Sequence, residues 1–299
     1  MEYLVIDVGG SAIKYALMND ELEMLKKGSL PTPQTNLEDF KQAIASLYQK
    51  YENQVDGIAM SLPGLINKKT QKMQIPGALY YNQNVEILKE LQSITTPRLT
   101  IENDAKCAAL CEVTYGNLQD TQVGAVCIIG TGIGGAFTIG KEVFTGAHGF
   151  SGEWSYLSFD WSKREGFEKK WGGEYGAFKL VDMICLSQGL EEGALDGIQA
   201  FELCNQGNKK ALQALEEFCD MTAMGLYNLQ AVVDPDKIAI GGGISQQPIL
   251  MEYLQKSLDK LYASLPPIPQ VNITRCKYHN DSNLIGALAK YKQVFHIHS

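Results

Sequence analysis

Three glycine-rich stretches each follow an apolar run that is typical of a buried β-strand: Gly9-Gly10-Ser11, Gly130–Gly135 and Gly241–Gly243. Glycine allows backbone N–H groups to approach a phosphate closely, and successive amides in a turn form a concave anion site. Ser11 and Thr131 can each add a hydroxyl donor to such a site. We therefore expect the first two stretches to bind phosphate groups.

A helix-based nucleotide site does not fit these stretches. "GTGIGG" (130–135) matches the dinucleotide fingerprint by letter, but the β-branched "AFTIG" that follows indicates a strand rather than a helix. "AIKYALM" (12–18) likewise indicates a second strand after Gly10, and no Walker string G-x-x-x-x-G-K-[ST] occurs. The glycines thus lie in hairpin bends, with Gly132 and Gly134 in the second bend. Ordinary tight hairpins remain the alternative.

Charged residues flank the first bend. Asp7 ends the first strand as a carboxylate suited to Mg²⁺ through water, and Lys14 can supply positive charge near phosphates. The alternative for Asp7 is that it accepts turn amides. Gly241, Gly242 and Gly243 offer a surface with little side-chain bulk, where a base or ribose can lie. A close strand–helix turn is the alternative there.

Asn103 and Asp104 lie in "TIENDAKCAA", where a strand meets a helix. This position favours Asp104 as an N-cap, and a carboxylate bonded to helix amides would be a poor general base. The residues alone leave both roles open.

The elements that must position these residues form two similar sets. Each set is a strand, a glycine bend and a strand, followed by further strands and helices, so we expect two α/β lobes, 1–118 and 119–299, with the hairpins facing one cleft. Helical spacing of apolar residues predicts these helices: 37–53, 85–92, 105–116, 174–190, 196–206, 208–231, 247–262 and 281–295.

Composition excludes several classes of protein. The formal net charge of −8 argues against broad binding to nucleic acid or to an anionic membrane. The seven cysteines are scattered with no CxxC pair, which favours reduced thiols and a cytoplasmic location. Asp7 interrupts the first apolar run, so no signal segment is expected, and no apolar run is long enough to span a membrane.

The ordered set of stretches resembles the ROK (repressor/ORF/kinase) family of sugar kinases, which belongs to the actin-like, hexokinase-type ATPase superfamily. The resemblance covers residues 3 to about 290. The stretches that carry it are 7–14 (DVGGSAIK), 61–64 (SLPG), 102–105 (ENDA), 130–135, 152–153 (GE) and 241–243.

The resemblance implies a two-lobed actin-like (ribonuclease H-like) α/β fold with a central cleft, in which the last helix, about 281–295, packs back on the first lobe. It implies that Asp104 is the general base of an ATP- and Mg²⁺-dependent kinase. Asn103, Glu153 and Gly64 would then contact the sugar, although Glu153 could instead be a solvated loop acid. A homodimer is also implied.

The chain departs from the family pattern beside Glu153. Tyr156 stands where many members have a histidine, and the segment 165–178, which matches their cysteine cluster, has no cysteine. Since structural zinc needs about four nitrogen or sulfur ligands, we expect no zinc. Tyr156 and Glu174 would take over contacts to the sugar. Trp161 and Trp171 either form an aromatic platform for the sugar or belong to a solvated segment.

Zinc-free members of the family include β-glucoside kinases. We therefore expect a kinase that phosphorylates the 6-hydroxyl of a glucose-type hexose or of a β-glucoside. The alternatives are a kinase for N-acetylmannosamine or fructose, and a sugar-binding sensor without turnover. Family repressors carry a helix-turn-helix before the first hairpin, and the strand that starts at residue 3 leaves no room for one.

Overall fold

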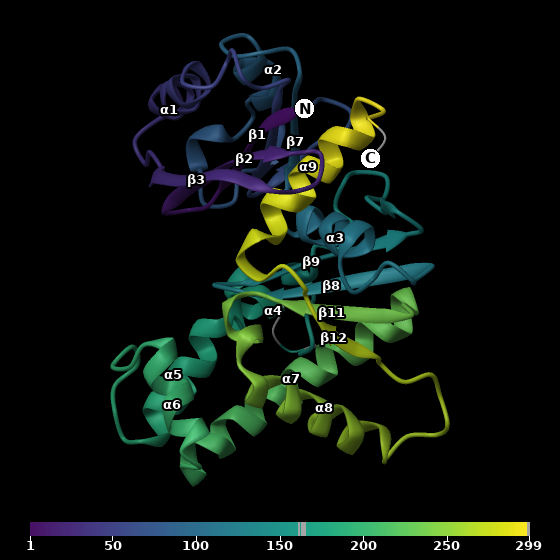
Figure 1. Ribbon diagram of the computed structural model, residues 1–299. Coiled ribbons are helices and arrows are strands. Elements are labelled where there is room, and N and C mark those ends of the chain that lie inside the picture. The colour runs from purple at the N-terminus through teal and green to yellow at the C-terminus, as the bar shows by residue number, and fades with distance from the viewer. Residues whose placement is uncertain (161, 163–165, 298–299) are drawn as a thin grey trace. The chain divides into compact units, whose positions relative to one another are not determined.

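The computed structural model describes residues 1–160, 162 and 166–297, and it separates into two compact units (Figure 1). Unit 1 contains Met1–Gly116, Lys141–Ser151 and the chain from Asp281 onward, and unit 2 contains Asn117–Gly140 and Gly152–Asn280. The segment Lys141–Ser151, which the sequence predicted in the second lobe, groups with unit 1, and two lysine side chains link it to the helix Asp104–Tyr115. Lys106 Nζ donates to the Gly149 carbonyl at 2.7 Å, and Lys141 Nζ donates to the Val113 carbonyl at 2.6 Å.

Unit 1 is built on a mixed five-stranded sheet in the order β3-β2-β1-β4-β7. β1 pairs antiparallel with β2 and parallel with β4, so the predicted strand–bend–strand hairpin is confirmed. The helix α9 packs against α3 and against β1, β4 and β7 (Figure 1, yellow). The bounds are β1 Glu2–Val8, β2 Ala12–Asn19, β3 Met24–Pro31, α1 Leu37–Gln49, β4 Ile58–Leu62, β5 Leu65–Ile66, β6 Met73–Ile75, η1 Tyr80–Asn82, α2 Ile87–Gln92, β7 Leu99–Asn103, α3 Asp104–Tyr115, β10 Glu142–Val143 and α9 Ser282–Val294. The short helix η5 His279–Asp281 begins in unit 2 and ends in unit 1.

The alternation of side chains along β1 decides which face carries chemistry. Leu4, Ile6 and Val8 join the core that also contains residues of α1 and α2. Because successive strand residues point to opposite faces, Tyr3 and Asp7 point to the other face, where Tyr3 meets Tyr291 of α9. Asp7 therefore lies on the face of the sheet that α9 covers.

Unit 2 repeats the plan with the strand order β9-β8-β11-β12. β8 and β9 form the second predicted hairpin, and the long helix α7 lies beside α8 and packs with α5 and α6 (Figure 1). The bounds are β8 Val123–Ile129, β9 Ile133–Ile139, η2 Trp154–Tyr156, η3 Phe167–Lys169, α4 Trp171–Glu174, α5 Ala177–Ser187, α6 Gly197–Asn205, α7 Lys209–Val233, β11 Lys237–Gly241, η4 Gly243–Gln246, α8 Pro248–Tyr262 and β12 Ile273–Arg275.

The long strand β3 and the short strands β5, β6 and β10 of unit 1 were not predicted from the sequence. β3 is an edge strand whose side chains are mostly exposed, and it includes Lys26, Lys27 and Gly28. This composition lacks the apolar alternation that marks a half-buried strand, and lysines are common on sheet edges because they discourage pairing with other chains. Among the described residues, no helix combines the length and apolar character that crossing a bilayer requires.

Candidate active site

The first glycine bend directs its carbonyl groups into the protein. The carbonyl of Gly9 accepts from Thr32 Oγ1 at 2.7 Å, and that of Gly10 accepts from Gln34 Nε2 at 2.6 Å. The carbonyl of Ser11 accepts from the Thr32 backbone N–H at 3.1 Å. All three acceptors of the bend are thus occupied by the short segment that follows β3.

Most of the N–H groups of the same bend, by contrast, have no hydrogen-bond acceptor among the described residues. Gly9 N–H closes the turn onto the Ala12 carbonyl, whereas the N–H groups of Gly10 and Ser11 have no acceptor within the described part of the chain. Such a bend presents donors only, which is the arrangement an anion requires. Thr32 and Gln34 were missed because the sequence gives no signal that joins them to a bend more than twenty residues earlier.

Asp7 and Lys14 are directly opposite each other in the β1–β2 ladder, so both project on one face beside the bend. Asp7 is 7% exposed, and its Oδ1 accepts from Ser61 Oγ at 2.9 Å and from Asn283 Nδ2 at 3.1 Å. Burial raises the pKa of this carboxyl, and the two hydrogen bonds and the Lys14 charge offset part of that rise.

A divalent cation fits Asp7. Among the ion pairs of the described residues, none contains Asp7, and neither hydrogen bond reaches its Oδ2. A buried carboxylate is costly unless it is paired or binds a metal, and an oxygen ligand suits Mg²⁺. Asp7 could therefore hold Mg²⁺, directly or through its water.

Asn103, rather than Asp104, caps helix α3. The Asn103 side-chain oxygen accepts from the Lys106 backbone N–H at 3.1 Å, and Asn103 has extended backbone angles. Asp104 is the first helical residue, and its Oδ1 accepts from the Ala105 N–H at 2.8 Å. Burial raises the pKa of Asp104, the Asp7 carboxylate adds to this rise, and the bond from Ala105 opposes it. The expectation that Asp104 could be the cap is therefore wrong.

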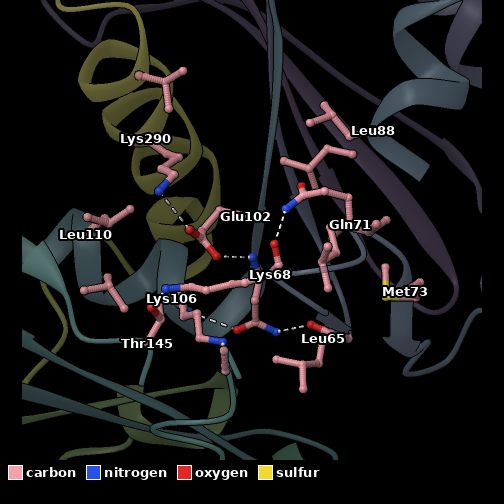
Figure 2. A pocket seen from close by; sticks show the side chains of 18 of the residues that line it. Leu65, Lys68, Gln71, Met73, Leu88, Glu102, Lys106, Leu110, Thr145 and Lys290 are labelled. Atoms are coloured by element: carbon pink, nitrogen blue, oxygen red, sulfur yellow. Dashed lines mark hydrogen bonds and ion pairs between the residues drawn. The ribbon is translucent and has the colours of Figure 1, made fainter. Parts of the chain in front are cut away.

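Gly64 and Asn103 lie together, since Asn103 Nδ2 donates to the Gly64 carbonyl at 3.0 Å. Gly64 has φ +104°, and a Cβ there would lie 2.2 Å from the Ile75 carbonyl oxygen, so only glycine fits. Both residues line a cavity of about 510 Å³ within unit 1. Figure 2 shows Lys290 of α9 pointing at Glu102 in this cavity, where their charged atoms are 3.2 Å apart. Neither Asp7 nor Asp104 lines it.

The second glycine bend, in unit 2, has the same polarity as the first. The carbonyl of Gly130 accepts from the Ala177 N–H at 2.7 Å, and that of Gly132 accepts from the Gly130 N–H at 2.9 Å. Within the described ranges, the N–H groups of Thr131 and Gly132 have no protein acceptor. Gly134 lies inside β9, opposite Ile128. Thr131 and Gly132 therefore form the bend itself, and Gly134 belongs to its second strand.

The three glycines after β11 have different roles in the fold. Gly242 has φ +91°, and a Cβ there would lie 2.1 Å from the Ile129 carbonyl oxygen; a Cβ at Gly241 would lie 2.4 Å from the Ile128 side chain. Both glycines are thus required by packing. A Cβ at Gly243 would meet nothing within 4 Å, so open space lies above this residue at the start of η4.

Trp154, which lies between Glu153 and Tyr156 in the sequence, fixes this segment to the core of unit 2. The Trp154 indole N–H donates to the Val126 carbonyl at 2.9 Å, and its ring stacks on Phe137 in the core of unit 2. Burial and the nearby Glu153 carboxylate raise the pKa of Tyr156. Tyr156 is 38% exposed and lies 5.1 Å, centroid to centroid, from the ring of Phe167, which is 48% exposed.

Glu174 belongs to α4, a short helix that packs against the η2 segment Trp154–Tyr156. It ends α4 and lines a separate cavity of about 150 Å³ with Asp160 and Lys169, and neither Glu153 nor Tyr156 lines that cavity. Trp171 is 1% exposed and packs edge-to-face on Phe159, so it is a core residue and cannot be a sugar platform. Trp161 lies outside the described residues.

The family model for ROK matches residues 3–294. The chain belongs to the ROK family. An N-acetyl-D-glucosamine kinase of Haemophilus influenzae is 27% identical over 305 residues, covering 97% of this chain and 99% of the relative. A β-glucoside kinase of Listeria monocytogenes is 28% identical over 303 residues, covering 98% of each. The solved structure of a ROK family protein from Streptococcus pneumoniae in complex with sucrose is 31% identical, with a TM-score of 0.86 and 99% of each chain covered.

These matches confirm the resemblance and the two-lobed actin-like α/β fold class, and they extend over nearly the whole chain. This ROK chain is an ATP:sugar phosphotransferase. Its relatives at 27% and 28% identity act on different sugars, so similarity alone does not select the hexose.

Proposed function

We propose that this kinase transfers the γ-phosphoryl group of ATP to the 6-hydroxyl of a glucose-type hexose or of a β-glucoside, with Asp104 as the general base. The observation that carries this proposal is that Asn103, and not Asp104, caps helix α3. The pKa of Asp104 is raised because burial outweighs the hydrogen bonds from Ala105 and Asn103. A raised pKa makes a carboxylate a better general base, because the best general base has a pKa close to the operating pH.

Asp104 would accept the proton of the sugar hydroxyl as the hydroxyl oxygen bonds to the γ-phosphorus and the bond to the bridging oxygen of ADP breaks. General-base assistance of this kind contributes about 10²–10⁴-fold to a rate. Charge neutralisation and positioning supply much of the remainder in phosphoryl transfer.

The two glycine bends would bind the phosphates through the backbone N–H groups that have no protein acceptor in the described ranges: Gly10, Ser11, Thr131 and Gly132. Ser11 and Thr131 add hydroxyl donors, Lys14 adds charge, and the open surface at Gly243, beside Gly241 and Gly242, would take the adenosine. Mg²⁺ bound with the nucleotide would neutralise phosphate charge, and Asp7 would hold it through water.

Glu153, Asn103 and Gly64 would each contact the sugar, and Tyr156 would take over the contact of the missing histidine. The exposed rings of Tyr156 and Phe167 support a β-glucoside, because aromatic faces bury the apolar face of a sugar ring or an aglycone. The sucrose complex of the Streptococcus pneumoniae relative gives independent support for a substrate with two rings.

We also propose that the protein holds no structural zinc and acts in the cytoplasm as a homodimer. Within the described ranges, no group of three or more His, Cys, Asp or Glu side chains could hold a metal ion, and His148 is exposed. All seven cysteines are buried without a disulfide, which suits a reducing compartment.

A sugar panel tests the proposed substrate. ADP release would be measured with cellobiose, glucose, N-acetylglucosamine, N-acetylmannosamine and fructose, and ³¹P NMR would locate the phosphate on the product. The proposal predicts the highest kcat/KM for cellobiose or glucose, with phosphate on the 6-hydroxyl. A clear preference for an N-acetylated sugar or fructose would assign another hexose, and tight sugar binding without ADP release would indicate a sensor.

A further inference from the structure

Asn283 contacts Asp7 across 276 residues of sequence. It lies in the first turn of α9, and its side-chain Nδ2 donates to Asp7 Oδ1 at 3.1 Å. Ser61 Oγ donates to the same oxygen at 2.9 Å. Both side-chain donors that reach Asp7 thus converge on one of its two carboxylate oxygens.

The strand register and the packing of α9 on α3 both fix the contact between Asn283 and Asp7. Ser61 on β4 is in register with Asp7 on β1, so both side chains lie on the face of the sheet that α9 covers. α9 is held close to α3 at Gly286, where a Cβ would lie 1.7 Å from the Cys107 carbonyl oxygen. The start of α9 is therefore fixed relative to the sheet, and Asn283 is delivered to Asp7 by backbone packing.

We propose that Asn283 is a positioning residue for Asp7, acting with Ser61 to hold Oδ1 so that Oδ2 is presented to a metal-bound water. This inference rests on the metal role proposed for Asp7. Two neutral donors on Oδ1 stop rotation of the carboxylate without neutralising its charge. The carboxylate consequently keeps its negative charge for a cation, whereas a lysine or arginine at position 283 would pair with that charge.

The test measures binding of Mn²⁺, as a probe for Mg²⁺, to the complex with the non-hydrolysable β,γ-imido analogue of ATP, using electron paramagnetic resonance. Asn283→Leu keeps the branching and the number of side-chain heavy atoms and favours the helix, while deleting the donor. Since a hydrogen bond to a charged group is among the stronger ones, we expect the Kd of Mn²⁺ to rise about tenfold. The KM for the sugar should stay within about twofold, because no sugar contact is changed.

Asp281→Asn is the matched control. It breaks the exposed ion pair with Lys27 (2.8 Å) at the same helix end and does not touch Asp7. The Kd of Mn²⁺ should be unchanged in this variant, whereas an equal weakening in both variants would assign the effect to the helix end and overturn the proposal. Asn283→Gln, which restores an amide donor, should recover part of the affinity.

The outcomes separate this inference from the proposed function. Wild-type Mn²⁺ affinity in Asn283→Leu would refute the positioning role while the kinase assignment stands. If Asn283→Leu does not fold, Asn283→Ala carries the same expectation and the same refutation. Absence of any Mn²⁺–nucleotide binding in the wild type would refute the metal role of Asp7 and the inference with it.

Discussion

The hydroxyl of Thr32 donates to the carbonyl of Gly9 at 2.7 Å, and this bond joins the segment after β3 to the first glycine bend. The backbone N–H of Thr32 also donates to the carbonyl of Ser11. One residue thus fixes both ends of the bend. Its effect is to direct carbonyl groups away from the side on which the N–H groups of Gly10 and Ser11 are available.

Deleting the Thr32 hydroxyl should weaken ATP binding. In Thr32→Val the Gly9 carbonyl loses its donor, so it can turn toward the phosphates and repel them. We expect the KM for ATP to rise about five- to tenfold, the effect of a hydrogen bond of about 1 kcal/mol, with the KM for sugar unchanged. Steady-state kinetics with each substrate varied would measure this.

Thr35→Val is the control for that variant. The Thr35 hydroxyl bonds the Asp39 carboxylate at the start of α1 and does not contact the bend. A similar rise in the KM for ATP in both variants would mean that general loosening of the segment 32–36, rather than bend geometry, sets nucleotide affinity.

Removing the charge of Asp7 should stabilise the ligand-free protein. The pKa of Asp7 is raised in the folded state, so the ionised carboxyl lowers stability above that pKa, and the loss is relieved as pH falls through it. Asp7→Asn should therefore unfold at higher urea than the wild type at pH 7, and the difference should shrink toward pH ~4. Asp281→Asn, at an exposed pair, should shift the midpoint little. A lower midpoint for Asp7→Asn at pH 7 would show that its hydrogen bonds outweigh the cost of burial.

The aromatic pair should govern the choice between one and two sugar rings. Phe167→Ala removes the partner ring of Tyr156, and we expect kcat/KM for cellobiose to fall about tenfold, the scale of an aromatic contact of about 1–1.5 kcal/mol, while that for glucose changes less. Leu186→Ala, at another exposed apolar residue of unit 2, serves as the control. Equal losses for both sugars would remove the basis for an aglycone site.

Metal analysis of the purified protein should find no zinc at stoichiometric level. The segment 165–178 contains no cysteine, and dialysis against EDTA should leave the melting temperature unchanged. One zinc per chain, or a melting temperature that falls on chelation, would contradict this expectation.

The local parts of this structure could be predicted from the sequence, and the long-range ones could not. The two hairpins follow from apolar runs broken by glycine, and their antiparallel register places Lys14 opposite Asp7. By contrast, β3 was not predicted because an exposed edge strand has no apolar alternation. The residues alone left open whether Asp104 caps α3, because both Asn and Asp are good N-caps, and the structure gives that place to Asn103. Thr32, Gln34, Ser61 and Asn283 reach the site only through tertiary packing, which no local pattern records.

Asp104→Asn, compared with the wild type for both turnover and sugar binding, tests the central claim most directly. The substitution keeps the shape and the bond from Ala105 but cannot accept a proton. We predict a kcat lower by about 10²–10⁴-fold, with the Kd for sugar, measured by calorimetry, changed by about threefold or less. A variant that retains wild-type turnover, or that loses turnover only because sugar no longer binds, would contradict the assignment of Asp104 as the general base.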